Sequence, residues 1–419
     1  MSKHCLSRLL NRLFAAVIFI AIIPGMLLTP IKPARAEPPP EVTAASAVLL
    51  DLTTGEFLFL KNPDKKKAPA SITKILTALV ALERGHLEDR ITISANPPRA
   101  EGTRVYLVEG ETVTLNDLLY GMLLNSGNDA ALAIAEHYGG SKAGFAKLMN
   151  EKAKQLGANN SNFVNPSGLS EPGHYITARD MAIIARAAMQ NKTLREIVAT
   201  KTYPWYGQDW QTTLVNQNKL LWKYEGANGI KNGYTSEANF TLVVSATRQN
   251  QTLIAVLLDE PSSEQAEADA IKLLDYGFQT FQSYLLVKQG EIVATITLEN
   301  GKKVELLARN DLAVITAANK DTAPTGYLQL VDYKRPVQAN TSMGAMVFLL
   351  DGQEIGRVEV INRQPIPSQP LSLGDWWLRI TLALVAVYLL VFTIKKLRRR
   401  NRYVKSYKYS FGGGLNERH

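Results

Sequence analysis

The segment from Trp376 to Ile394, WWLRITLALVAVYLLVFTI, places the strictest limit on what this chain can fold into. Its only charged residue, Arg379, lies one helical turn from its start. Inside a bilayer every backbone N–H and C=O group has to be hydrogen-bonded within the protein, so a single segment of this kind must be a helix. At about 1.5 Å per residue it reaches about 28 Å, close to the hydrocarbon thickness of a bilayer. We therefore predict a transmembrane helix over residues 376–394.

Basic residues on one side of this segment predict its orientation. Six Lys and Arg side chains lie within residues 395–402, and positive charge of this kind marks the cytoplasmic end of a membrane helix. We therefore expect residues 395–419 to form a basic cytoplasmic tail and the chain before residue 376 to lie on the extracytoplasmic side of the cell membrane. The alternative is an amphipathic helix in the membrane interface. That helix would need charges along its length, and Arg379 alone does not provide them.

Residues 1–36 have the features of a secretory signal peptide. A basic start precedes an apolar run over residues 13–28, and Ala34-Arg35-Ala36 offers small residues at the two positions that a signal peptidase reads. We therefore expect cleavage before Glu37. A retained membrane anchor is the alternative, but the apolar run is short and Pro24 interrupts it.

Several classes of function are excluded by composition. The only cysteine, Cys5, lies in the signal peptide, so the mature chain has no thiol for a nucleophile, a disulfide or a metal site. Neither a His-Glu-x-x-His motif nor a phosphate loop occurs, and we predict no metal and no cofactor. Of the net charge of +9, residues 1–36 contribute +5 and residues 395–419 contribute +8, which leaves −4 for residues 37–394. The basic character therefore belongs to the ends, and we predict no nucleic-acid partner.

The exported part begins with a spacer at residues 37–43 and continues as an α/β domain over residues 44–284. Two β-rich runs around Thr53-Thr54-Gly55 predict a hairpin, and helical periodicity starts at Ser71 and ends at Gly85. Strands come first, helices in the middle, and strands with a helix last, which indicates an antiparallel sheet packed against helices. The further expected elements are helices at 115–124, 129–137, 142–156, 178–190 and 266–281, and strands at 240–247 and 252–259.

Residues 285–362 contain only short strands, and we predict a separate small β domain. Asn300-Gly301 and Asp351-Gly352 each separate two apolar runs and favour two-residue hairpin turns. Residues 363–375, with three prolines, form a linker to the membrane helix.

The first candidate for chemistry is Ser71-Ile72-Thr73-Lys74, at the start of the first buried helix. A spacing of three places both polar side chains on one helical face. A serine hydroxyl is a weak nucleophile unless a neighbouring base takes its proton, and a lysine can do so when burial or a second cation lowers its pKa. Taken alone, the pattern also fits an ordinary helix start with a solvated lysine.

Two later segments carry further polar residues. Ser126-Gly127-Asn128 lies in a break between two apolar helices, and Lys231-Asn232-Gly233-Tyr234-Thr235 precedes the long strand. Each of them alone also fits an ordinary structural reading, as the end of a helix or as a glycine turn that enters a strand.

In this order, the three segments resemble the Ser-x-x-Lys, Ser-x-Asn and Lys-Thr-Gly motifs of the penicillin-recognising serine peptidases. More narrowly, the chain resembles the low-molecular-weight D-alanyl-D-alanine carboxypeptidases. The likeness runs from about Ala44 to Phe281, includes PASITKILTALVALE and NFVNPSGLSEPGHYITARDMAIIARAA, and continues through the β domain and the anchor. It implies a catalytic domain of the β-lactamase and transpeptidase fold.

The resemblance also implies roles for the catalytic residues. Ser71 attacks the carbonyl between two D-alanines of a peptidoglycan stem peptide and forms an acyl-enzyme, which water releases. Lys74 removes the proton from Ser71. Ser126 helps to relay this proton to the departing amine, and Asn128 holds both the peptide amide and Lys74.

The third motif is implied to bind the substrate, through Lys231, Asn232, Gly233, Tyr234 and Thr235. Lys231 provides positive charge for the terminal carboxylate and for the hydroxyl of Ser126. The oxyanion lies between the backbone N–H groups of Ser71 and Tyr234. β-Lactam antibiotics are implied to acylate the same serine.

This sequence departs from the family pattern at two positions that concern the substrate carboxylate. Asn232 replaces the usual Thr, and Ala266 occupies the place where many members have an Arg, since residues 260–272 contain none. Our hypothesis from the sequence is that acylation is retained while the requirement for a free C-terminus is relaxed, with slow or endopeptidase activity as the result.

Two alternative functions stay open. A β-lactamase would share the first motif but would need neither a β domain nor a membrane helix, and rapid turnover of a chromogenic cephalosporin would indicate it. A catalytically weak penicillin-binding receptor of the cell wall would be labelled by penicillin without releasing D-alanine.

Overall fold

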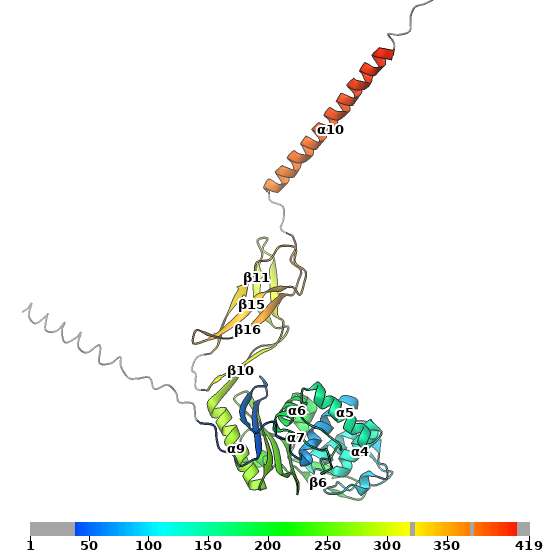
Figure 1. Cartoon of the computed structure of the whole chain (residues 1–419), viewed down its shortest axis with the longest axis vertical. Coiled ribbons are helices and arrows are strands. Elements are labelled where there is room, and N and C mark those ends of the chain that lie inside the picture. The colour runs from blue at the N-terminus through cyan, green and yellow to red at the C-terminus, as the bar shows by residue number, and fades with distance from the viewer. Residues whose placement is uncertain (1–37, 319–322, 369–372, 409–419) are drawn as a thin grey trace, which may run out of the picture. The chain divides into compact units, whose positions relative to one another are not determined.

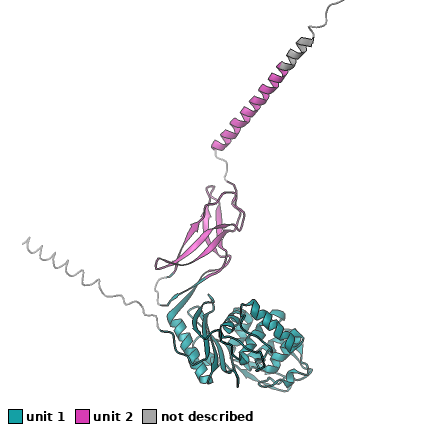
Figure 2. Cartoon of the chain, viewed as in Figure 1, with its two compact units in different colours: residues 1–286, 313–323 teal, residues 287–312, 324–419 magenta. Residues whose placement is uncertain are grey.

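The computed structural model describes residues 38–318, 323–368 and 373–408. The expected signal peptide with Cys5, and the end of the basic tail, lie outside the described residues. The chain divides into two compact units, residues 1–286 with 313–323, and residues 287–312 with 324–419 (Figure 2).

The first unit contains a five-stranded antiparallel sheet in the order β2-β1-β9-β8-β7. Its strands are β1 (Ser46–Asp51), β2 (Phe57–Lys61), β7 (Ala227–Thr235), β8 (Asn239–Arg248) and β9 (Gln251–Glu260). The helices are η1 (Ala70–Thr73), α2 (Lys74–Arg84), η2 (Pro97–Arg99), α3 (Leu115–Leu124), α4 (Asn128–Gly139), α5 (Lys142–Gln155), α6 (Ala178–Gln190), α7 (Lys192–Ala199), α8 (Leu220–Lys223) and α9 (Ser263–Thr280). Three small two-stranded sheets pair β3 (Arg90–Thr92) with β4 (Thr112–Thr114), β5 (Thr202–Tyr206) with β6 (Gln211–Val215), and β10 (Phe281–Val287) with β13 (Leu312–Ala317).

Helices cover both faces of the five-stranded sheet (Figure 1). Helix α9 packs on β1, β8 and β9, whereas α6 and α7 pack on the other face. The central strand β9 contributes alternate side chains to the two cores: Leu253 and Leu257 face α9, and Ile254 and Val256 face the other helices. Because both faces are buried, β9 reads in the sequence as a continuous apolar run rather than an alternating one.

The predicted α/β class, the first hairpin and the two long strands are confirmed. The helices expected at 115–124 and 178–190 have these bounds in the structure. The helix expected from Ser71 begins instead as the 3-10 turn η1 and becomes α-helical at Lys74, and it ends at Gly85 as expected. Helix α7 and the hairpin β5–β6 were not predicted from the sequence.

The second unit contains its own antiparallel sheet, in the order β11-β12-β16-β15-β14. The strands are β11 (Ile292–Thr297), β12 (Lys303–Ala308), β14 (Thr325–Leu330), β15 (Ser342–Leu350) and β16 (Gln353–Asn362). The hairpins predicted around Asn300-Gly301 and Asp351-Gly352 are β11–β12 and β15–β16. Residues 313–323, which the sequence suggested as part of this domain, belong to the first unit.

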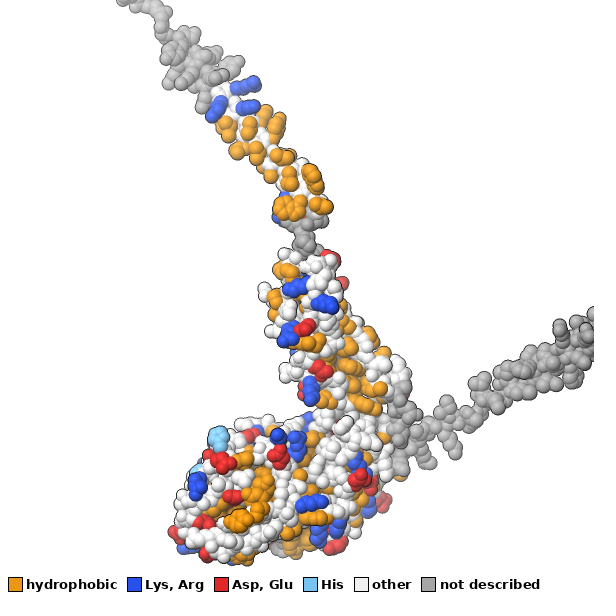
Figure 3. Space-filling model, turned by 180° about the vertical axis from the view of Figure 1, so that it is seen from behind, with side chains coloured by type: hydrophobic (Ala, Val, Ile, Leu, Met, Phe, Trp, Pro, Cys, Tyr) orange, Lys and Arg blue, Asp and Glu red, His pale blue; other side chains and the backbone are white. Residues whose placement is uncertain are grey.

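Helix α10 (Leu373–Lys408) contains the segment predicted to cross the membrane. Among the described residues, Leu373–Arg399 is the one helix long and apolar enough to do so, with a mean hydropathy of 2.2 in its most apolar window. Figure 3 shows apolar side chains along this helix and Lys and Arg side chains beyond them. This helix is consistent with a C-terminal membrane anchor.

Candidate active site

Ser71 lies in η1, immediately before α2. The preceding residue, Ala70, has φ +52°, in the left-handed region that residues other than glycine rarely adopt. One residue earlier, the carbonyl of Pro69 accepts a hydrogen bond of 3.0 Å from the hydroxyl of Thr241 on β8. The start of the helix is therefore tied to the sheet, which fixes the position of the serine.

Lys74 lies one turn further on, with its amine against the hydroxyl of Ser71. The distance from Nζ of Lys74 to Oγ of Ser71 is 2.9 Å, and Nζ also donates to the carbonyl of Ser167 at 2.7 Å. The side chain of Lys74 is 0% exposed although it can carry a charge. The contact predicted from the Ser-x-x-Lys spacing is present in the structure.

The surroundings of Lys74 favour its neutral form. Burial lowers the pKa of Lys74 well below its usual value, and the charge of Lys231 lowers it further, whereas Asp129 acts in the opposite direction. Lys231 on β7 is 1% exposed, and burial lowers its pKa to about 7. A neutral amine has a lone pair, so Lys74 can accept the proton of Ser71.

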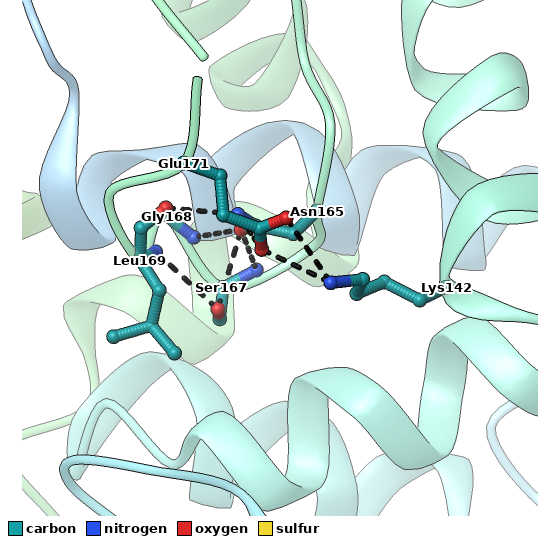
Figure 4. A network of polar contacts seen from close by, with 6 residues as sticks. All are labelled: Lys142, Asn165, Ser167, Gly168, Leu169 and Glu171. Carbon is teal, nitrogen blue, oxygen red and sulfur yellow. Dashed lines mark hydrogen bonds and ion pairs between the residues drawn. The ribbon is translucent and has the colours of Figure 1, made fainter. Parts of the chain in front are cut away.

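A tight turn that begins at Asn165 carries the carbonyl bound by Lys74 (Figure 4). Oδ1 of Asn165 accepts the backbone N–H groups of Ser167 at 3.2 Å and Gly168 at 2.7 Å, and Nδ2 donates to the carbonyl of Leu169 at 2.8 Å. Gly168 has φ +89°, and a Cβ there would lie 1.8 Å from the carbonyl oxygen of Ala70. The turn is thus held by one amide side chain and fits closely against η1.

The same amide joins the turn to the protein surface. Nδ2 of Asn165 also donates to the carboxylate of Glu171 at 2.9 Å, which pairs with the amine of Lys142 at 3.1 Å (Figure 4). The Lys142 side chain is 50% exposed and that of Glu171 36%, so this ion pair contributes at most about 1 kcal/mol to stability.

Strand β7 brings the third motif to the serine. A Cβ on Gly233 would lie 2.6 Å from the backbone nitrogen of Ser71, so only glycine allows the strand to come this close. The amine of Lys231 donates to the carbonyl of Asn232 at 3.1 Å and to its Oδ1 at 3.3 Å. Tyr234, which follows Gly233, has an exposed side chain.

Thr235, the last residue of this motif, is partly exposed. Its hydroxyl is 3.2 Å from that of Ser170 and accepts the backbone N–H of Ala238 at 3.1 Å. Ser170 follows the turn of Asn165, so this contact joins β7 to the loop that also contacts Lys74.

The second motif is buried between α3 and α4. Ser126 has φ +66° and is 5% exposed, and strained backbone of this kind is common at active sites. Nδ2 of Asn128 donates to the carbonyl of Glu101 at 2.7 Å. Within the described residues, no hydrogen bond joins Ser126 or Asn128 to Lys74 or Lys231, so the expected contact of Asn128 with Lys74 is not formed here.

The sequence did not identify Asp129, Asn165 and Ser167 as part of the site. The carboxylate of Asp129 accepts the backbone N–H groups of Val105 and Leu107 at 3.0 and 3.2 Å, which fixes the loop before the second motif. The only signal for Asn165 and Ser167 was the stretch NPSGL within the family resemblance.

The comparisons with known proteins match this geometry. A family model described as D-alanyl-D-alanine carboxypeptidase, of peptidase family S11, matches residues 33–262, which is more than half of the chain. The chain belongs to this family. Its members are serine hydrolases, and a second model, the C-terminal domain of penicillin-binding protein 5, matches residues 281–368 of this family member.

Individual members of the family are similar to most of this chain. It is 32% identical over 387 residues to the D-alanyl-D-alanine carboxypeptidase DacF of Bacillus subtilis, with 88% of this chain and 99% of DacF covered. Penicillin-binding protein 5 from Haemophilus influenzae superposes with a TM-score of 0.68 and 31% identity, covering 79% of this chain and 99% of the other. A mutant of the Streptomyces K15 DD-transpeptidase superposes with a TM-score of 0.55 at 34% identity, covering 57% of this chain and 99% of the transpeptidase. The fold predicted from the sequence resemblance is thereby confirmed.

We expect Lys231→Met to raise the melting temperature, and to raise it more at pH 7 than at pH 9. The unfolded chain keeps Lys231 protonated up to its ordinary pKa of 10.5, whereas burial lowers the pKa to about 7 in the folded chain. Above pH 7, folding therefore removes a proton, and this cost falls by about 1.4 kcal/mol for each pH unit up to the ordinary pKa. Thermal unfolding of the unchanged chain and of Lys231→Met at pH 7 and pH 9 measures this difference in melting temperature.

Lys201→Met is the matched control, because Lys201 is exposed. We expect it to change the melting temperature little and equally at both pH values. An equal gain at both pH values for Lys231→Met would show that Lys231 is not neutralised on folding.

Proposed function

We propose that this chain is a serine D-alanyl-D-alanine carboxypeptidase that removes the terminal D-alanine from peptidoglycan stem peptides. The observation that carries the proposal is the buried amine of Lys74, 2.9 Å from the hydroxyl of Ser71 and with a lowered pKa. The relatives named above as carboxypeptidases support the same reaction.

The first half of the reaction forms an ester. Oγ of Ser71 attacks the carbonyl carbon between the two D-alanines while its proton passes to Nζ of Lys74. The negative charge on the carbonyl oxygen lies between the backbone N–H groups of Ser71 and Tyr234. The close approach of Gly233 to the nitrogen of Ser71 supports this arrangement.

The tetrahedral intermediate then collapses. The C–N bond breaks, the nitrogen of the departing D-alanine takes a proton that Ser126 relays from Lys74, and the peptide stays as an ester on Ser71. We assign Asn128 to the amide of the bound peptide, and Lys231 with residues 232–235 to the end of the substrate. Ser126 and Asn128 are both buried, which supports a role for each inside the site.

Water completes the cycle. It adds to the ester carbonyl and gives up a proton to Lys74, and the C–O bond to Ser71 breaks as the hydroxyl regains its proton. β-Lactam antibiotics are the second class of ligand, because they present a strained amide to the same serine and stay attached as esters.

Ser71→Ala is expected to lower the release of D-alanine from a peptide ending in D-Ala-D-Ala by at least about a thousandfold. Labelling by a fluorescent penicillin should disappear as well, since both reactions need Oγ of Ser71. Ser94→Ala is the control, because Ser94 lies in the same unit and hydrogen-bonds Glu136 rather than the site.

Three outcomes would contradict the proposal. Full activity of Ser71→Ala would place the nucleophile elsewhere. Penicillin labelling of the unchanged chain without D-alanine release would indicate a wall receptor, and rapid turnover of a chromogenic cephalosporin would indicate a β-lactamase.

Asn165→Ala is expected to slow acylation by penicillin about tenfold to a hundredfold, because the turn that positions Lys74 loses its central hydrogen bonds. Burial is what lowers the pKa of Lys74, so a looser turn should also move the pH dependence of acylation to higher pH. Measuring the acylation rate from pH 5 to 10 tests both effects.

Lys142→Ala is the matched control for this variant. It removes the exposed end of the same network and leaves Asn165 in place, so its acylation rate and pH profile should match those of the unchanged chain. If Asn165→Ala were slower but kept the same pH profile, Asn165 would have a structural role only.

We also propose that residues 376–394 cross the cell membrane once, with the catalytic unit outside and residues 395–419 in the cytoplasm. The apolar length of α10 and the basic residues after it support this orientation. In cells with the wall removed, added protease should degrade the catalytic unit while an epitope at the C-terminus stays protected. Degradation of the epitope in these cells while their membrane is intact would reverse the proposed orientation.

A further inference from the structure

Glu237 lies in the turn between strands β7 and β8, two residues after the end of the third motif. Its side chain is exposed, and its Oε2 accepts a hydrogen bond of 2.9 Å from the hydroxyl of Ser170. The same hydroxyl is 3.2 Å from that of Thr235. Ser170 belongs to the loop that also contacts Lys74, so the carboxylate of Glu237 lies where this loop meets the end of β7.

The charge of this carboxylate is not neutralised by a neighbouring side chain. Within residues 38–318 no Lys or Arg forms an ion pair with Glu237, whereas Glu171, the residue after Ser170, pairs with Lys142. The hydrogen bond from Ser170 lowers the pKa of Glu237 below its usual value, so the group is ionised at neutral pH. An exposed anion that is held in place and has no cation beside it is complementary to a cationic ligand.

The proposed function gives the direction in which a peptide passes this carboxylate. Lys231 is assigned to the C-terminal end of the substrate, and the N–H group of Tyr234 to the carbonyl of the penultimate D-alanine. The residue before the two D-alanines therefore lies beyond Tyr234, towards Glu237. An extended peptide advances only about 3.3 Å per residue, so a long side chain on this residue is within reach of the turn after β7.

We propose that Glu237 binds the ammonium group on the side chain of the residue that precedes the two terminal D-alanines. A diamino acid presents such a group, because one of its amines is in the peptide bond and the second is at the end of its side chain. A carboxylate has about four acceptor positions, so the bond from Ser170 leaves room for the ammonium. This inference rests on the proposed function, because it names the substrate class of the same site.

The resulting preference among substrates is modest, because the carboxylate is exposed to water. An exposed ion pair changes an equilibrium by at most about fivefold, and added salt weakens it. Glu237 takes no part in making or breaking bonds. It therefore selects peptides by the charge of one side chain, whereas Ser71 and Lys74 act on every peptide that is bound.

The test compares two peptides on the full chain in detergent. One is α-acetyl-L-Lys-D-Ala-D-Ala with a free ε-amine, and the other is the same peptide acetylated on that amine, which removes its charge. We expect kcat/KM for the release of D-alanine to be about three- to fivefold higher for the free amine at low salt. This ratio should fall towards one in about 0.5 M sodium chloride, because salt screens exposed charges.

Variants of Glu237 identify the group that produces the preference. Glu237→Gln should bring the ratio of the two kcat/KM values to about one, and Glu237→Lys should bring it below one, because like charges repel. Glu56→Gln is the matched control. It removes another exposed carboxylate, immediately before β2 at the opposite edge of the sheet, so the ratio should stay that of the unchanged chain.

The outcomes separate this inference from the proposed function. If the unchanged chain releases no D-alanine from either peptide, the proposed function fails. If it releases D-alanine from both peptides equally well, or if Glu237→Gln and Glu237→Lys keep the ratio of the unchanged chain, Glu237 does not bind the ammonium group. An equal loss of kcat/KM for both peptides in these variants would give Glu237 a structural role only and would overturn the inference as well.

Discussion

The catalytic unit depends on keeping two lysine side chains buried close together, and no carboxylate in the described part of the chain pairs with either amine. An amine in this position is stable only if it gives up its proton, because desolvation and the neighbouring charge both oppose the charged form. Helix α2 supplies Lys74 and strand β7 supplies Lys231, and the cores on both faces of the sheet hold these two elements in place. Burying these two amines therefore lowers the stability of the fold at the place where the reaction needs a base.

Local patterns explain why much of this arrangement was predictable. Ser71 and Lys74 are three residues apart, so their contact follows from helix geometry once the helix is recognised. The apolar runs of β8 and β9, the glycine turns of the hairpins and the length of α10 were equally visible. Helix α7 has apolar Leu194, Ile197 and Val198 at helical spacing, but its eight residues are too few for this period to be decisive. In the hairpin, β5 contains Pro204 and each strand buries one side chain fully, so neither has the pattern of a core strand.

The contacts between distant segments were not predictable in the same way. Ser167 lies 93 residues from Lys74 in the sequence, and nothing near either residue indicates that a backbone carbonyl meets the amine. The ion pairs of Glu267 are a similar case, since Lys219 and Lys223 look like ordinary surface charges until the fold places their amines 3.7 and 2.6 Å from its carboxylate. Tertiary packing decides both, and a carbonyl or a surface lysine leaves no motif in the sequence.

The order of the main sheet has a consequence for how a peptide is recognised. Strand β7 is at the edge: it pairs with β8 on one side, and no strand of residues 38–318 or 323–368 pairs with it on the other. An edge strand offers unpaired N–H and C=O groups at regular intervals, so an extended chain can be bound there through its main chain alone. Recognition of this kind reads the direction and chirality of a backbone rather than the identity of its side chains. Such a surface sets few limits on the side chains of a peptide that it binds.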